Sequence, residues 1–418
     1  MPIQTQHGRR AVLPTSTLSP SSFVLPVRET TDTGYWENVP NADAVGRRLL
    51  VVGSSPICLL IALTASRSGY AVTLVERSDR LGGAWAVDEV EGRLIDRACH
   101  LLEPLAPARR WVFEQLGEEP MAYPHPPTAI TPWDSIWPIS SRRYRALELA
   151  MALPAATRHI AMAAIGDRQD FRRVLAECRH DLGRLTRRAV QELWSGPSQS
   201  MTFSPQPFAH LCELVVDSVD EVRLSQNVAR ISHVSSTGAY SVNFNGLEER
   251  FDQVVVPSGA DIEISVAGHQ LPHRQFHFEN HHLLFEATAG ERNLSYVAFM
   301  ANPAVRRVTD TGPDASPDSG RHLYLAQVRG PDVSVEDVAQ LLARHGYIDA
   351  STETRLVRHY RFTSTRTSFL GPLPPGLWAP DTYGDLSDNL ARLLELRSDG
   401  EVHLRLPFAP FPELRSVR

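Results

Sequence analysis

The sequence predicts an α/β protein built on a doubly wound parallel sheet, with a helical insertion and a second, substrate-side β-sheet. Three observations support this fold class. A strand, a helix and a strand follow one another between Leu49 and Glu76, which is the size of one βαβ unit. Helical patterns rich in Ala, Leu and Arg occupy much of 105–200. Short strand patterns recur from Val222 to Gln327.

Each element of the βαβ unit has a local cause. Leu49–Val52 is an apolar run that ends at Gly53, as expected of a parallel strand buried on both faces. Pro56–Ser68 is an apolar helix pattern closed by Gly69, and Ala71–Glu76 is the second strand. Further along, helices are predicted over 333–345 and 387–396.

Composition narrows the function classes. The chain has 418 residues, 42% of them hydrophobic, and a formal net charge of -6, so a broad nucleic-acid surface is not expected. All 42 basic residues are arginine, which excludes lysine Schiff-base chemistry and a Walker-type lysine. The four cysteines are far apart and form no CxxC pair, which favours a reducing, cytoplasmic location. No apolar run of about 18 residues occurs, so we expect no membrane span.

The loop after the first strand resembles a phosphate loop with altered glycines. In such loops one glycine allows the tight turn, a second lets the backbone approach a pyrophosphate, and a third permits close helix packing. Gly53 keeps the first glycine position, Ser55 holds the second and Cys58 holds the third. Ser54 lies between Gly53 and Ser55. Ser55 and Pro56 also suit the N-cap and first position of a helix. A helix that starts with a serine cap and a proline leaves fewer N–H groups to donate hydrogen bonds to a phosphate. This loop alone therefore does not decide whether a dinucleotide binds.

The residues after the second strand point more clearly to a dinucleotide. Glu76 ends that strand, where an acidic residue usually binds ribose hydroxyls; the alternative is an ordinary strand-end charge. Arg77 follows it, and then Gly82 and Gly83 precede Ala84-Trp85. A glycine pair lets the backbone approach a flat ligand, although a simple turn is the alternative. Together these residues favour FAD over NAD.

Later motifs extend this pattern. The segment 91–102 carries His100, 257–261 reads Pro-Ser-Gly-Ala-Asp, and 268–279 reads GHQLPHRQFHFE. With the glycine pair, they make the chain resemble the FAD-containing amine-oxidase-like superfamily, and within it UDP-galactopyranose mutase. The resemblance covers roughly 47–280, with a weaker tail to about 396. It implies that Val228 faces adenine through its backbone and that His100 lies beside the flavin as the catalytic residue.

The resemblance also assigns the cofactor-binding residues. They are Gly53, Ser54, Ser55, Glu76, Arg77, Gly82, Gly83, Ala84, Trp85 and Val228. The implied activity is flavin-dependent isomerisation or oxidation of a sugar nucleotide or another small polar substrate.

Two departures from the family leave an alternative open. The arginine-bearing substrate segment is missing between Trp194 and the stretch 201–207. The C-terminal stretch 403–412 keeps Arg405 but lacks the glycine of the family's flavin-side Gly-Arg pair. The alternative is therefore a degenerate member that binds little or no flavin and serves as a partner or binding subunit, in a homo- or hetero-oligomer.

Other clusters carry weaker hypotheses. Histidines occur at 273, 277, 281 and 282, but strand alternation would split them between two faces, and we predict no metal site. Arginines at 355, 358, 361 and 366 could bind a phosphate or carboxylate, or form a solvated basic face. Asp96, Arg97 and His100 could serve in proton transfer, or could have a packed or hydrogen-bonded structural role.

The predicted domains are discontinuous. They are a flexible N-terminal arm (1–46), a dinucleotide-binding domain (47–103, 201–265 and 385–418), a helical insertion (104–200) and a substrate-side sheet domain (266–384).

Overall fold

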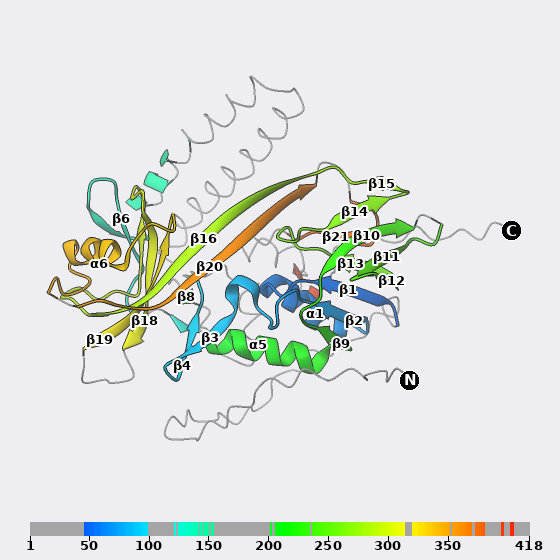
Figure 1. The fold of residues 1–418 in the computed structure, drawn as a ribbon, viewed down its shortest axis with the longest axis horizontal. Helices are drawn as coiled ribbons and strands as arrows, with labels where there is room; N and C mark the ends of the chain where they lie inside the picture. Colours follow the sequence, from blue (N-terminus) through cyan, green and yellow to red (C-terminus); the bar gives the residue numbers. More distant parts are fainter. Residues whose placement is uncertain are drawn as a thin grey trace, which may run out of the picture. The chain divides into compact units, whose positions relative to one another are not determined.

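A parallel sheet of five strands forms the centre of the first of two units in the computed structural model (Figure 1). Unit 1 comprises Met1–Gly83, Cys212–Gln275 and Arg366–Arg418, and unit 2 comprises Ala84–Leu211 and Phe276–Thr365. The residues that the structure describes are 46–98, 121–122, 124–141, 143–144, 146–148, 150–151, 153, 201–202, 205–234, 236–313, 320–351, 353–369, 373–380, 394–396 and 402–404.

The parallel sheet of unit 1 has the doubly wound order. Its strands are β1 (Arg48–Val52), β2 (Ala71–Val75), β9 (Glu221–Arg223), β13 (Gln253–Val255) and β21 (Leu377–Trp378). They lie in the order β21-β13-β1-β2-β9, and every neighbouring pair is parallel. Successive strands are therefore added on one side of β1 and then on the other, so the order reverses between β1 and β13. In open α/β sheets, ligands bind at the carboxyl ends of the strands beside this reversal.

Helix α1 (Pro56–Arg67) connects β1 to β2 and is buried from Pro56 to Ala65. Its apolar composition follows from this burial, because a helix that is hydrophobic all round must be covered on all sides. The predicted βαβ unit is thus present, with Pro56 at the start of the helix and Gly69 just beyond its end at φ +95°. The α/β fold class predicted from the sequence is confirmed.

Unit 1 also contains a second sheet of five strands. These are β10 (Val228–Val234), β11 (Ala239–Phe244), β12 (Leu247–Phe251), β14 (Glu263–Val266) and β15 (His269–Gln270), in the order β12-β11-β10-β14-β15. Alternate residues of β11 are buried, which is the pattern of a sheet with one face on the core. Tyr240 and Phe251 are the largest fully buried side chains of the core that the two sheets share.

Unit 2 is built on a seven-stranded sheet. Its strands, in spatial order, are β20 (Arg355–Phe369), β16 (His273–Thr288), β19 (Arg321–Val328), β18 (Val305–Pro313), β17 (Tyr296–Phe299), β6 (Thr128–Ile130) and β7 (Ile136–Pro138). Both β16 and β20 begin in one unit and end in the other. Helix α6 (Val335–Arg344) buries Val338 and Leu342 in a core shared with Phe285 of β16.

Smaller elements complete the description. They are the turn η1 (Gly83–Trp85), strands β3 (Val87–Val90), β4 (Arg93–Asp96), β5 (Met121–Ala122), β8 (Met201–Thr202), β22 (Leu394–Leu396) and β23 (Val402–Leu404), and helix α5 (Pro205–Ser218). The prediction of a helix over 387–396 is wrong at its C-terminal end, since Leu394–Leu396 is a strand that pairs with β23. No helix in the described part of the chain is long and apolar enough to span a membrane.

The units compare with the predicted domains as follows. Unit 1 has three chain segments, as the predicted dinucleotide-binding domain has, but its first segment ends at Gly83 and its last begins at Arg366. The arm residues 1–45 and most of the insertion 104–200 lie outside the described residues; those described between 143 and 153 are helical.

Candidate functional site

Gly53 makes the tight turn between β1 and α1. Its φ is +79°, a left-handed conformation that favours glycine, and its N–H donates to the carbonyl of Val75 at 2.7 Å. A Cβ at this position would lie 3.3 Å from Cγ of Pro257, two residues after the end of β13. The loop therefore lies where the strand order reverses, between the carboxyl ends of β1 and β13.

Ser55 occupies the N-cap of α1, but its side chain makes no capping hydrogen bond, so the predicted side-chain cap is wrong. Its φ of −61° and ψ of 157° are ordinary for any residue. Its Oγ is buried and has no oxygen or nitrogen partner in the described structure. The neighbouring Cys58 thiol is only a weak partner. The first-turn N–H groups of α1 are thus not used by the cap and remain suited to an anion.

Cys58 takes the position of the third glycine, and it is a packing residue. It is fully buried, and burial raises the pKa of its thiol to about 12. The thiol is therefore neutral near pH 7 and acts as a small apolar group between helix and sheet.

Ser54, Glu76 and Gly82 form a buried hydrogen-bond network. Ser54 donates to Oε2 of Glu76 twice, from its backbone N–H at 3.0 Å and from its hydroxyl at 2.6 Å. The N–H of Gly82 donates to Oγ of Ser54 at 2.7 Å, and the N–H of Ser78 donates to Oε1 of Glu76 at 2.9 Å. Ser54 is 1% exposed and Glu76 is 6% exposed. This network joins the loop, the end of β2 and the glycine pair.

The segment that leads to Val228 runs beside Glu76. The N–H of Glu76 donates to the carbonyl of Arg223 at 2.8 Å, and the N–H of Gln226 donates to the carbonyl of Glu76 at 3.1 Å. Val228 opens β10, where it pairs with Phe244 of β11, while pairing with β14 begins two residues later. Its side chain is buried in the core. The structure thus brings the predicted ribose and adenine residues into one region of unit 1.

The glycine pair also has left-handed backbone angles, with φ +114° at Gly82 and +55° at Gly83. A Cβ at Gly83 would meet no atom within 4 Å, so this backbone borders open space. Arg77 is exposed on the same connection. Ala84 and Trp85 belong to unit 2, in which the rings of Trp85 and Phe208 lie 6.2 Å apart.

The remaining predicted groups are separated or already paired. His100 lies outside the described residues, and so does Arg405. The side chains of His273, His277, His281 and His282 contact Leu271, Thr365, His359 and Arg97, respectively. No group of three metal-ligating side chains occurs among the residues searched, which are the described ones.

Three arginines of the predicted cluster on β20, at 355, 358 and 361, are paired with carboxylates within unit 2. Arg355 bonds Glu286 at 2.6 Å and Glu91 at 2.7 Å. Arg358 donates to Asp88 at 3.0 Å, and Arg97 donates to the same carboxylate at 2.8 Å. Asp88 is 4% exposed, and the positive charges of these two arginines offset the free-energy cost of burying its carboxylate. These three arginines therefore form ion pairs within the fold, and the side chain of Arg366 lies outside the described part of the chain.

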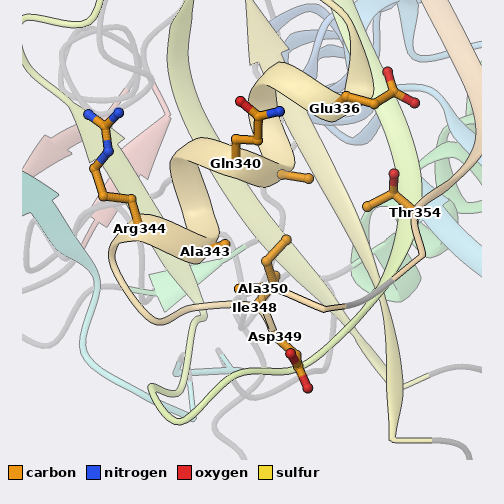
Figure 2. Close-up of a pocket in the computed structure, with 9 residues that line it drawn as sticks. Glu336, Gln340, Ala343, Arg344, Ile348, Asp349, Ala350 and Thr354 are labelled. Atoms are coloured by element: carbon orange, nitrogen blue, oxygen red, sulfur yellow. The ribbon is translucent and has the colours of Figure 1, made fainter.

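A separate hollow of about 470 Å³ lies along α6 in unit 2 (Figure 2). It is lined by Glu336, Ala339, Gln340, Ala343, Arg344, Ile348, Asp349, Ala350 and Thr354. None of the predicted site residues lines it.

Sequence reasoning missed Ser54 and Ser78 as partners of Glu76. The signal for Ser54 was its small hydroxyl side chain next to Gly53, together with the acidic residue Glu76 at the end of a buried strand. Ser78 acts through its backbone N–H and therefore gives no signal in residue type.

Comparisons with known proteins agree with this geometry. Residues 51–116 match the family model of the NAD(P)-binding Rossmann-like domain. Residues 51–83 of this match lie in unit 1, which has a Rossmann-like fold. No curated protein matches the sequence.

Among solved structures, cyclohexylamine oxidase from Brevibacterium oxydans is 12% identical over 82% of this chain and 96% of its own, with a TM-score of 0.53. Putrescine oxidase is 15% identical over 83% of this chain and 98% of its own, with a TM-score of 0.50. The PF1083 protein from Pyrococcus furiosus is 14% identical over 82% of this chain and 95% of its own, with a TM-score of 0.51. The chain shares the fold of these proteins.

Proposed function

We propose that the chain binds FAD at the carboxyl end of the unit 1 sheet and is a flavin-dependent oxidoreductase of the amine-oxidase type. The observation that carries the proposal is the convergence of Gly53, Glu76 and the Val228 segment beside the reversal of strand order. A dinucleotide needs a left-handed turn for its phosphates, an acid for its ribose and a backbone edge for its adenine.

The residues present fit a dinucleotide. The hydroxyl of Ser55 is buried with no partner stronger than the Cys58 thiol. It lies at the start of α1, where the cap leaves N–H groups from which a pyrophosphate would accept hydrogen bonds. Gly83 borders open space, as a backbone next to a flat ring must. In this proposal Glu76 accepts a hydrogen bond from the ribose, the backbone of Val228 faces adenine, and Gly82 to Trp85 lie near the flavin. His100 would be the catalytic residue, and bound FAD would supply an acceptor for a hydride.

The structural relatives favour oxidation over isomerisation. Putrescine oxidase and cyclohexylamine oxidase are amine oxidases by name, which makes a small amine the first substrate class to test. UDP-galactopyranose mutase-like chemistry on a sugar nucleotide rests on the sequence motifs alone, and the described residues add nothing in its favour.

The test is a flavin titration with matched glycine variants. The purified protein, examined by visible absorption and then titrated with FAD, should bind it stoichiometrically. Gly83→Ala should lower the affinity at least about tenfold, because the methyl group enters the space reserved for the ligand. Gly246→Ala is the control: Gly246 also has a positive φ (+94°) and open surroundings, but it lies in the turn between β11 and β12. Absence of flavin both before and after titration would overturn the proposal.

A second function has one observation in its favour. Ser54 donates two hydrogen bonds to the carboxylate of Glu76, and these bonds hold the shape of the loop without a ligand. A family member that no longer binds flavin and instead serves as a binding subunit could keep this arrangement. The same titration separates the two functions, since this subunit would remain colourless in excess FAD.

A further inference from the structure

The carboxylate of Glu76 is almost fully engaged before any nucleotide is considered. A carboxylate offers about four acceptor positions, two on each oxygen. Oε2 accepts both the N–H and the hydroxyl of Ser54, while Oε1 accepts the N–H of Ser78. One acceptor position therefore remains, on Oε1.

The hydroxyl of Ser54 is fixed in this role. It accepts the N–H of Gly82 at 2.7 Å, and this bond directs its own hydrogen toward Oε2. Because Ser54 is 1% exposed, water does not compete for either bond. Oε2 is thus blocked by a buried and geometrically constrained donor.

We propose that Ser54 is a specificity-determining residue that limits Glu76 to one of the two ribose hydroxyls of a bound adenine nucleotide. The 2′ and 3′ hydroxyls of ribose are adjacent, so a carboxylate with both oxygens free can accept one hydrogen bond from each. Here the second hydroxyl is left without the carboxylate as a partner and stays in solvent. This inference rests on the proposed function, since it takes Glu76 to be the ribose ligand.

The test compares ADP with 2′-deoxy-ADP and 3′-deoxy-ADP by isothermal titration calorimetry, or by displacement of FAD if the protein retains flavin. For the native protein, one deoxy nucleotide should bind about tenfold more weakly than ADP and the other as well as ADP. In Ser54→Ala the freed Oε2 accepts the second hydroxyl, so both deoxy nucleotides should bind more weakly than ADP. Equal losses for both analogues in the native protein, or an unchanged pattern in Ser54→Ala, would overturn the proposal.

Two variants serve as controls. Ser78→Ala makes the same chemical change at a residue that bonds the same carboxylate only through its backbone, so the native pattern should persist. Ser54→Thr keeps the hydroxyl and should also keep the native pattern of analogue binding. If Ser54→Ala does not fold, the native protein's response to the two analogues still decides the proposal.

The outcomes also separate this proposal from the function it rests on. Binding of ADP without binding of FAD would overturn the flavoprotein function and leave the analogue pattern to judge Ser54. Binding of FAD with equal analogue losses would overturn the role of Ser54 alone. Binding of neither ADP nor FAD would overturn both.

Discussion

Replacing Ser55 by Ala should leave unit 1 as stable as before, or make it slightly more stable. An N-cap serine normally contributes about 1 kcal/mol through the hydrogen bond it accepts, and its loss costs that amount. Ser55 accepts no such bond. Its hydroxyl is buried without a partner, and a buried unsatisfied polar group costs about 1–3 kcal/mol. The contact with the Cys58 thiol recovers part of that cost, so we expect a gain of roughly 0–1 kcal/mol.

Helix α6 provides the matched control. Ser334 is its N-cap, and its Oγ accepts the N–H of Asp337 at 3.1 Å, while Asp337 accepts the N–H of Ser334 at 3.0 Å. This is a complete capping box. Ser334→Ala should therefore destabilise unit 2 by about 1–2 kcal/mol, although the substitution is the same.

The measurement is urea unfolding of flavin-free protein, followed by far-ultraviolet circular dichroism and fitted with a separate transition for each unit if two are seen. The two variants should differ by roughly 1–3 kcal/mol, which combines the two expectations. A loss of about 1 kcal/mol or more in Ser55→Ala would refute the reasoning, because it would require a cap that the structure lacks.

Three further predictions follow from single residues. Gly53→Ala should destabilise unit 1 by about 1–2 kcal/mol in urea unfolding, since it forces a left-handed φ and brings a Cβ against Pro257; an unchanged midpoint would contradict this. Cys58 should resist alkylation at mildly alkaline pH until the protein unfolds, because burial raises its pKa to about 12; peptide mass spectrometry would expose any earlier labelling. The hydrogen bond to Asp310 raises the pKa of His322, so its stabilisation is full below the unfolded-state pKa of about 6.5 and is lost as pH rises through the folded value. The difference in unfolding free energy between the native protein and His322→Gln should shrink as the pH rises from the unfolded-state pKa through the folded-state pKa. A difference independent of pH would contradict this prediction.

Local elements were predictable because their causes are local. The βαβ unit followed from an apolar run, a glycine at each turn and a helix pattern between them. The strands β9, β13 and β21 have only two or three residues each, and their places in the parallel sheet depend on partners far away in the sequence. No periodicity in so short a segment specifies which strand it joins.

The sequence indicated residues that the structure places close together, but not the hydrogen bonds that join them. Glu76 and Gly82 were predicted as separate ligand contacts, and the structure shows that Ser54 joins them through hydrogen bonds. Ser54 and Gly82 are 28 residues apart, so only the folded chain brings them together. The side-chain cap expected at Ser55 failed for a related reason. Residue type indicates that a serine can accept a hydrogen bond, but its rotamer and neighbours decide whether it does.

The altered glycine motif follows the backbone geometry of the loop. Glycine is kept at Gly53, Gly82 and Gly83, where φ is positive and a side chain would strain the chain. It is replaced at Ser55, whose φ is −61°, and at Cys58, which is helical. Those two positions required only space, not an unusual conformation. The changes therefore leave the turn and the helix packing intact. In the proposed function their effect falls on the space for the pyrophosphate: Ser55 narrows that space with its Cβ and offers a donor through a hydroxyl whose only other contact is the weak one with the Cys58 thiol.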